Sequence, residues 1–279
     1  MTTLFFATGT GRCGTMWLAN LLNSETNTIA LHEGKTRVLE EEGEQYIPFL
    51  TLQNRQAYDA PSSAHFLFKK YRSGLSDIAS QHDSSIFGDV AYNYAPFVSA
   101  IHKQYPQAKL IYLYRNGIDF VRSCTTDLVP DPVPVGWPPK NKKLSKLERY
   151  ISLGRLKPSL TDPLHQHWDS LSVVAKNAWL WAETNRIILQ QLESVTNENV
   201  IPLRFESFVK SPEQTYQKIR SALGINKELS AETRTLIERP INKREQKLLP
   251  KWDHWTQSDK NDFTQFAESM MLKLGYDLE

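Results

Sequence analysis

The chain has 279 residues, a mass of 32.1 kDa and a hydrophobic content of 40%, which allows one large α/β domain or two small ones. Its 33 basic and 31 acidic residues leave a net charge of +2, so no global positive field indicates a nucleic-acid partner. No apolar run reaches the length of a membrane helix.

The two cysteines and the N-terminus suggest a compartment. Cys13 and Cys124 are the only cysteines, and neither lies in a metal-binding spacing. The first predicted strand follows Met1 almost directly, which leaves no room for a signal peptide. We therefore expect a soluble, cytoplasmic protein with free thiols, no bound metal and no membrane partner.

Strands and helices alternate along the sequence. Strands are predicted at 4–7, 28–31, 109–114 (as the central strand) and 199–204, and short elements at 65–71 and 85–90. Helices are predicted at 15–22, 36–56, 96–105 and 172–191, and a further helix begins at Pro212 with Ser211 as its cap. This alternation predicts a single α/β domain over residues 1–279, with a central parallel sheet of about five strands flanked by helices.

A proline-rich segment interrupts this pattern at about 128–168. Residues 128–163 hold seven of the 15 prolines. Trp137 lies among these prolines, and several lysines follow it. Prolines at this density support neither a regular helix nor a central strand. The segment is predicted to be a lid over a site, or alternatively a variable surface insertion.

A glycine-rich turn joins the first predicted strand to the first helix. Gly9, Gly11 and Gly14 let the backbone turn sharply and point its N–H groups toward a common ligand. Arg12 adds a permanent positive charge, and Thr15 adds a hydroxyl at the first turn of the helix. These features predict a site for an anion.

Two common phosphate motifs fit this turn to different degrees. A nucleotide kinase needs G-x-x-x-x-G-K-S/T, but Thr15 occupies the position of the lysine. A dinucleotide-dependent oxidoreductase needs G-x-G-x-x-G and an acid about 20 residues later, which Gly9, Gly11, Gly14 and Glu33 supply. An NAD(P)-dependent enzyme therefore stays open at this point, as does a nucleotide-binding module without catalysis.

A second motif follows the strand at 109–114, where Arg115 precedes Ser123 by eight residues. The loop Arg12-Cys13-Gly14-Thr15-Met16-Trp17 resembles the K/R-S-G-T-T-W loop of sulfotransferases that use 3′-phosphoadenosine 5′-phosphosulfate (PAPS). Arg115 and Ser123 resemble the 3′-phosphate site of the same family. The segments 203–208 and 272–276 are similar to later motifs of that family, so the resemblance covers most of the chain.

The resemblance implies a P-loop-like sulfotransferase fold, PAPS as donor, and 3′-phosphoadenosine 5′-phosphate (PAP) as product. It places donor contacts in the first loop, at the second motif, at the aromatic residue after the late strand, and in a basic C-terminal stretch that matches by position and charge alone. The implied donor-binding residues are Gly11, Arg12, Cys13, Gly14, Thr15, Met16, Trp17, Arg115, Ser123, Phe205, Arg244 and Lys247.

Three of these residues depart from the family pattern. Cys13 replaces the usual Ser and Met16 replaces the second Thr, so two hydroxyls near the phosphosulfate are lost. Backbone N–H groups, Arg12 and Thr15 are then expected to carry more of the binding. Phe205 replaces a Tyr, which keeps an aromatic surface for adenine and removes one hydrogen bond.

Arg12, Glu33 and His32 are the predicted catalytic residues. Arg12 is expected to stabilise charge on the leaving phosphate. The segment that begins His32-Glu33 resembles the E-E-T-R stretch of tyrosylprotein sulfotransferases, where the catalytic Glu follows the loop Arg by 21 residues. Glu33 is therefore the predicted general base, with His32 as its rival. Because side chains alternate along a strand, only one of them is expected to reach the substrate.

The resemblance implies transfer of a sulfuryl group to a hydroxyl or, less favoured, a nitrogen of an acceptor, and these motifs do not fix which acceptor that is. The Glu33 spacing favours a tyrosyl peptide, whereas the aromatic and proline-rich segment favours a small metabolite, which we take as the expected acceptor. Asp89 lies where several relatives carry a lysine, so it is a candidate contact for a cationic acceptor or, alternatively, a helix cap.

Overall fold

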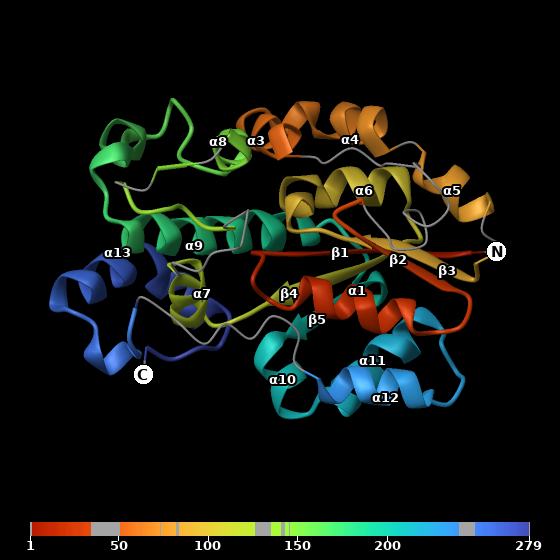
Figure 1. The fold of residues 1–279 in the computed structure, drawn as a ribbon. Coiled ribbons are helices and arrows are strands. Elements are labelled where there is room, and N and C mark those ends of the chain that lie inside the picture. The colour runs from red at the N-terminus through yellow and green to blue at the C-terminus, as the bar shows by residue number, and fades with distance from the viewer. Residues whose placement is uncertain are drawn as a thin grey trace.

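The computed structural model describes residues 2–278 with the exception of 35–50, 73, 82–83, 126–134, 141–142, 145 and 240–248. The strands of the described residues form one parallel sheet (Figure 1). They are β1 (Thr3–Gly9), β2 (Thr28–His32), β3 (Ile86–Val90), β4 (Lys109–Tyr114) and β5 (Val200–Arg204). Their order across the sheet is β2-β3-β1-β4-β5. The predicted α/β domain with a five-stranded parallel sheet is confirmed.

The sheet order corrects the predicted place of the strand at 109–114 and argues against a dinucleotide-binding fold. The central strand is β1, whereas 109–114 was predicted for that place and forms β4, beside it. A dinucleotide-binding fold has the order 3-2-1-4-5-6, in which the acid after β2 lies next to β1. Here β3 is inserted between them, which places Glu33 two strands away from the glycine-rich turn.

Helices cover both faces of the sheet (Figure 1). One face packs against α1 (Thr15–Asn23), α10 (Phe205–Lys210), α11 (Pro212–Leu223) and α12 (Ala231–Glu238). The other packs against α3 (Thr51–Asp59), α4 (Ala64–Arg72), α5 (Leu75–Gln81), α6 (Val98–Gln104), α7 (Gly117–Cys124), α9 (Val173–Leu192) and α13 (Gln257–Lys273). Helix α8 (Lys146–Gly154) packs on α3. Short 3-10 turns lie at Pro61–Ser63, Tyr92–Phe97 (η2), Pro163–Ser170, Asn197–Asn199 and Trp252–His254.

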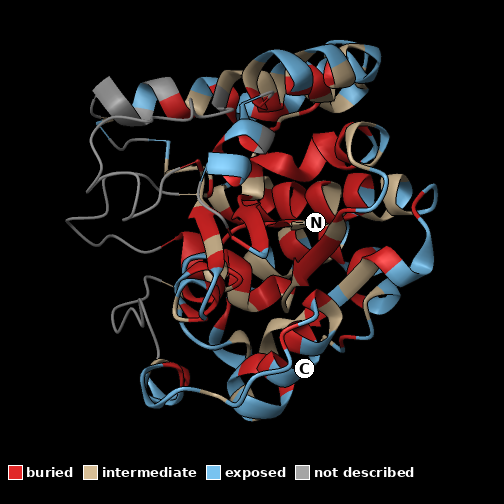
Figure 2. Cartoon of the chain, turned by 90° about the vertical axis from the view of Figure 1, so that its right-hand side faces the viewer, coloured by how far each residue is buried: buried red, intermediate tan, exposed pale blue. Residues whose placement is uncertain are grey.

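The two cores follow from the alternation of side chains along each strand. On β1, Phe6 enters the core on the α9 side, whereas Phe5 and Ala7 enter the core on the α1 side. On β4, Leu110 enters the core on the α9 side and Ile111 enters the core on the α1 side. Since both faces of every central strand are covered, these strands read as continuous apolar runs. The buried residues accordingly gather in the sheet and on the inner sides of the helices (Figure 2).

Most predicted elements are found close to their predicted bounds, with two differences. The helix predicted over 96–105 begins as the 3-10 turn η2 and becomes α-helical only at Val98, because Pro96 cannot donate a backbone hydrogen bond. Ser211 does precede Pro212 at the start of α11, but its side chain makes no capping hydrogen bond. Of the helix predicted over 36–56, residues 36–50 lie outside the described part. Among the described residues, no helix is both long and apolar enough to span a membrane.

A buried ion pair joins the end of α1 to α11. Arg220 Nε lies 2.7 Å from Glu25 Oε1, and the two side chains are 1% and 5% exposed. Arg220 also donates to the backbone oxygen of Lys227, and the Tyr216 hydroxyl donates to Leu21 O at 2.8 Å. This network fixes the helix that follows the glycine-rich turn against the C-terminal half of the chain.

We predict that Arg220→Met destabilises the fold by about 3–5 kcal/mol, because it leaves the Glu25 carboxylate buried without its charge partner. Arg234→Met is the matched control. Arg234 pairs with Glu213 at 3.2 Å, but both side chains are more than half exposed, so the loss should be about 0.2–1 kcal/mol. Urea unfolding measures both values, and equal losses would contradict the importance of the buried pair.

Candidate functional site

The anion loop, residues 10–14, joins β1 to α1 in an unusual backbone conformation. Gly11, Arg12 and Gly14 have φ angles of 75°, 53° and 87°. Left-handed residues close together turn successive N–H groups toward a common concave side, which suits an anion. Arg12 is the informative member, because a non-glycine residue at positive φ is strained and such strain concentrates at functional sites.

Close packing around the loop requires glycine at two positions. A Cβ at Gly9 would lie 2.2 Å from Leu113 O of β4, which no rearrangement of a side chain relieves. A Cβ at Gly14 would lie 3.0 Å from the ring of Phe205, at a φ that already disfavours side chains. The loop is therefore seated against β4 and Phe205 without a gap.

The N-terminus of α1 is left open toward the loop. Its cap residue is Gly14, no side chain caps its N–H groups, and the first turn contains no acidic residue. The partial positive charge of the helix end is thus not balanced by its own side chains. Together with Arg12, this end of the helix provides the electrostatics that an anionic ligand needs.

Two hydrogen bonds connect the anion loop to the second motif. Arg12 Nε donates to Ser123 Oγ at 2.9 Å, and Arg115 Nη1 donates to Arg12 O at 2.5 Å. Arg115 follows β4, and Ser123 lies on α7. The structure therefore brings together three residues that the sequence placed in separate phosphate motifs.

Arg115 is held in place from several sides. Its guanidinium lies 4.8 Å from the centre of the Phe205 ring, and its Nη2 lies 3.9 Å from Asp119 Oδ2. Its backbone oxygen accepts the indole N–H of Trp181 at 3.1 Å. The side chain is 11% exposed, so it is a pre-positioned cation rather than a free surface arginine.

Glu206 supports the second motif, and no individual role for it was predicted from the sequence. Its Oε1 accepts the backbone N–H of Asn116 at 2.8 Å, and its Oε2 accepts the Tyr276 hydroxyl at 2.7 Å. Asn116 in turn caps α7 by accepting from the N–H groups of Ile118 and Asp119. Glu206 and Tyr276 lie in the segments 203–208 and 272–276, so the family resemblance was the available signal.

His32 and Glu33 lie at the carboxyl end of β2 in different backbone states. His32 is the last strand residue, and its Nε2 lies 3.4 Å from Thr15 Oγ1, beside the anion loop. Glu33 has a φ of 57° and belongs to the following turn. Side-chain alternation along a strand therefore does not apply to this pair, because the strand ends before Glu33, and which of the two side chains reaches the substrate stays a prediction.

Burial lowers the pKa of His32, and the neighbouring Asp89 carboxylate raises it in part. The imidazole is therefore neutral at pH 7. Glu33 lies near Tyr92, since burial first and then the Glu33 carboxylate raise the pKa of the Tyr92 phenol.

Asp89 is a fully buried carboxylate with internal partners. Its Oδ2 accepts the Tyr94 hydroxyl at 2.6 Å, and its Oδ1 accepts the Gly34 N–H at 3.2 Å. Arg72 Nε lies 4.0 Å from Oδ2 and donates to the Tyr94 hydroxyl at 2.9 Å. Asp89 thus fixes the turn that carries Glu33, and it caps no helix through these contacts.

The remaining loop residues differ in exposure. Cys13 is buried, and burial raises its pKa to about 11 although Arg115 lowers it in part. Met16 is 41% exposed. Trp17 is 8% exposed, donates its indole N–H to Leu236 O at 2.9 Å, and lies edge-on to Phe208 at 4.4 Å. The adenine contacts implied for Trp17 and Phe205 stay predictions, and Arg244 and Lys247 lie outside the described residues.

Part of the proline-rich segment is fixed to the fold. Trp137 exchanges two hydrogen bonds with the side chain of Asn177 on α9, at 2.7 and 3.0 Å. Its indole N–H donates to Leu156 O at 3.1 Å, and its ring lies edge-on to Trp168. Residues 126–134, 141–142 and 145 of this segment lie outside the described part, so its role as a lid stays a prediction.

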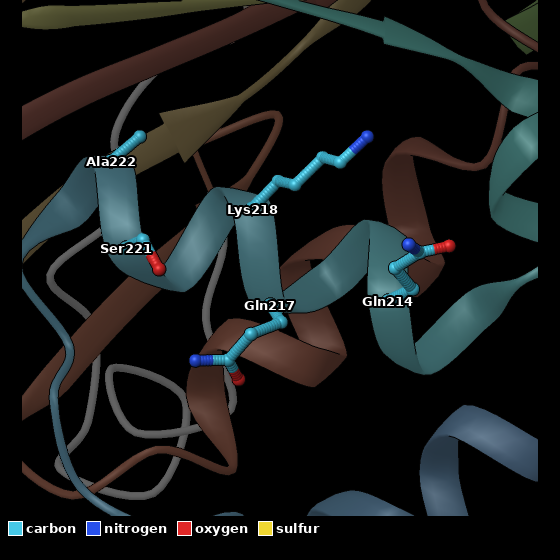
Figure 3. A pocket seen from close by; sticks show the side chains of 5 residues that line it. All are labelled: Gln214, Gln217, Lys218, Ser221 and Ala222. Atoms are coloured by element: carbon cyan, nitrogen blue, oxygen red, sulfur yellow. The ribbon is translucent and has the colours of Figure 1, made fainter.

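Among the described residues, a hollow on α11 and a hollow at the anion loop lie in very different places. A shallow one lies on α11 and is lined by Gln214, Gln217, Lys218, Ser221 and Ala222 (Figure 3). A second, with a volume of about 20 Å³, lies directly behind the anion loop and has Thr10 in its wall. Only the second is lined by a residue of the candidate site. No group of three or more potential metal-binding side chains occurs in the described parts of the chain.

Comparison with known proteins gives a family match. A family model described as "Sulfotransferase domain" matches residues 3–271. The sulfotransferase domain of the Synechococcus PCC 7002 olefin synthase has 15% identity and a TM-score of 0.53, covering 100% of this chain and 96% of that one. Sulfotransferase STF1 from Mycobacterium tuberculosis H37Rv has 14% identity and a TM-score of 0.50, covering 95% and 77%. At this identity the two structures show a shared fold. Among curated proteins, none matches the chain in sequence.

We predict that Gly14→Ala destabilises the protein more than Gly224→Ala. Both glycines have φ near 80°, so both variants carry similar backbone strain. A Cβ at Gly224 has no neighbour within 4 Å, whereas one at Gly14 meets Phe205. The difference should shrink in a Phe205→Leu background. Chemical unfolding measures all of these variants, and equal effects of the two alanines would contradict the tight contact.

Proposed function

The chain belongs to the sulfotransferase domain family, and from this premise we propose that it transfers a sulfuryl group from PAPS to a hydroxyl of a small-molecule acceptor, with PAP as the other product. The observation that carries this proposal is the contact between the two phosphate motifs. Arg115 bonds the backbone of Arg12, and Arg12 bonds Ser123. A ligand that bears two separated phosphates uses such a pair of adjoining sites.

The residues present fit this donor. The open N-terminus of α1, the left-handed anion loop, Arg12 and Thr15 would hold the 5′-phosphosulfate. Arg115 and Ser123 would hold the 3′-phosphate, with charge-assisted hydrogen bonds from a guanidinium that is already fixed. Phe205 lies beside both Gly14 and Arg115, which suits an aromatic surface for the adenine between the two sites.

Bound PAPS would supply an activated sulfuryl group on its 5′-phosphate. Arg12 then has the role of stabilising negative charge where the leaving phosphate lies. Glu33 is the proposed base that takes the proton of the acceptor hydroxyl, and its turn is held by the buried Asp89. His32 is the competing base, since burial keeps its imidazole neutral and able to accept a proton.

We predict that Arg115→Ala weakens PAP binding by about 1.5–3 kcal/mol, the usual contribution of hydrogen bonds to a charged group. Binding of adenosine 5′-monophosphate, which lacks the 3′-phosphate, should weaken much less. Isothermal titration calorimetry with both nucleotides separates the two effects.

Arg122→Ala is the control for this experiment. Arg122 lies on α7 and pairs with the same Asp119 as Arg115 does. It therefore reports a general loss of positive charge, and it should reduce PAP affinity only slightly. Equal losses for the two nucleotides in Arg115→Ala would remove Arg115 from the 3′-phosphate site.

We predict that Glu33→Gln lowers the rate of sulfuryl transfer by about 10²–10⁴-fold while PAP affinity stays nearly unchanged. His32→Gln should cost much less, because an amide can keep the hydrogen bond to Thr15. The measurement is single-turnover transfer at saturating PAPS, with an acceptor found by mass-spectrometric screening of hydroxyl compounds. An active Glu33→Gln beside an inactive His32→Gln would instead make His32 the base.

A further inference from the structure

The small cavity behind the anion loop has a polar wall for which the proposed chemistry gives no role. Its polar lining comes from the loop, α3, the start of η2, the residue after α8, and α9, and consists of Thr10, Asn54, Tyr92, Arg155 and Thr184. Val135 and several aliphatic residues complete the wall. A volume of about 20 Å³ accommodates one group of the size of a water molecule.

Asn54 presents an unused hydrogen-bond acceptor to this region. The residue is 4% exposed, and its Nδ2 donates to Gly154 O at 2.9 Å. Its buried Oδ1 has no hydrogen-bond partner among the described residues. Because buried polar atoms are almost always paired in folded proteins, this oxygen calls for a ligand group that donates.

The same cavity also offers hydrogen-bond donors. Arg155 is 4% exposed, its Nη1 donates to Ser152 Oγ, and its guanidinium lies 5.7 Å from the centre of the Trp137 ring. A guanidinium donates and never accepts. Tyr92 adds a phenol that stays neutral, because burial and the neighbouring Glu33 both raise its pKa. A neutral phenol both donates and accepts.

These groups select among ligand chemistries. A carboxylate could pair with Arg155, but because it only accepts hydrogen bonds it would leave Asn54 Oδ1 unpaired, and it would lie near the Glu33 carboxylate, whose charge reaches Tyr92 in the same wall. An ammonium group would be repelled by Arg155, and a methyl group would satisfy no polar partner. A hydroxyl donates to Asn54 and accepts from Arg155 or Tyr92, and it has the right size.

The cavity lies on the acceptor side of the candidate site. Thr10 belongs to the anion loop, and a Cβ at Gly11 would lie 3.6 Å from Tyr92 Cβ. Tyr92 is also close enough to Glu33, the proposed base, to feel its charge. The proposed donor contacts Arg115 and Ser123 instead follow β4, on the other side of β1 from β3.

We propose that this cavity binds a second, neutral hydroxyl group of the acceptor, so that the protein prefers diol- or polyol-like acceptors over mono-alcohols and hydroxy acids. This inference rests on the proposed function, since it assigns the cavity to the acceptor of that reaction. Asn54 is then a specificity-determining residue.

The test compares three probes of similar size: trans-cyclohexane-1,2-diol, cyclohexanol and trans-2-hydroxycyclohexane-1-carboxylate. Ligand-observed NMR measures the binding of each probe, both to the PAP-saturated protein and to the protein without PAP. We expect the diol to bind at least about tenfold more tightly than cyclohexanol and the hydroxy acid to bind least, because a buried polar site rejects analogues that leave its groups unpaired.

Asn54→Leu should abolish the preference for the diol while leaving PAP affinity unchanged. Thr184→Val is the second variant, because it removes one hydroxyl of the same wall and keeps the shape of the side chain. It should reduce the preference for the diol, and it provides the test if Asn54→Leu fails to fold. Equal binding of diol and cyclohexanol, tightest binding of the hydroxy acid, no binding of any probe, or a preference that survives in both variants would overturn the proposal.

The outcome is separable from that of the proposed function. Failure of the wild-type protein to bind PAP would reject the donor assignment. The preference for the diol is then measured with the protein in the absence of PAP. Normal PAP binding without a diol preference would reject the hydroxyl pocket and leave the donor assignment intact.

Discussion

The backbone of the anion loop is the constraint on which the rest of the site depends. Arg12 is held at a φ of 53°, a conformation that a non-glycine residue keeps only when its surroundings impose it. Its backbone oxygen is bonded by Arg115, its side chain is bonded by Ser123, and Gly9 lies directly on β4. The loop is therefore shaped by the strand next to β1, and hydrogen bonds join the two predicted phosphate motifs directly.

The sheet order explains why these motifs meet. With β1 at the centre, the loop after it lies between the ends of β3 and β4. The end of β4 supplies Arg115, and the end of β3 leads to Tyr92 and the small cavity. Ligands of open α/β sheets bind at the carboxyl edge of the strands. The proposed donor and acceptor regions thus occupy the two sides of one loop.

The C-terminal segment completes the second motif from a distance in sequence. Glu206 bonds the backbone of Asn116 and the hydroxyl of Tyr276, while Met271 Sδ accepts from the N–H of Gly117 at 3.3 Å. The start of α7 is therefore fixed by residues from α10 and from the end of the chain. Its orientation, and with it the place of Ser123, depends on the folded C-terminal part.

The sequence alone predicts the α/β class, four of the five strands and several of the helices, and it picks out the two candidate phosphate motifs, because apolar runs, glycine spacing and the Arg115–Ser123 interval are local properties of the chain. It did not determine that β1 is central, that Glu33 leaves the strand, or that Asp89 is buried with Arg72 and Tyr94. Strand order and buried partners depend on contacts between residues far apart in the chain, and local sequence patterns do not specify these contacts. Only the tertiary structure therefore decided how the site is assembled.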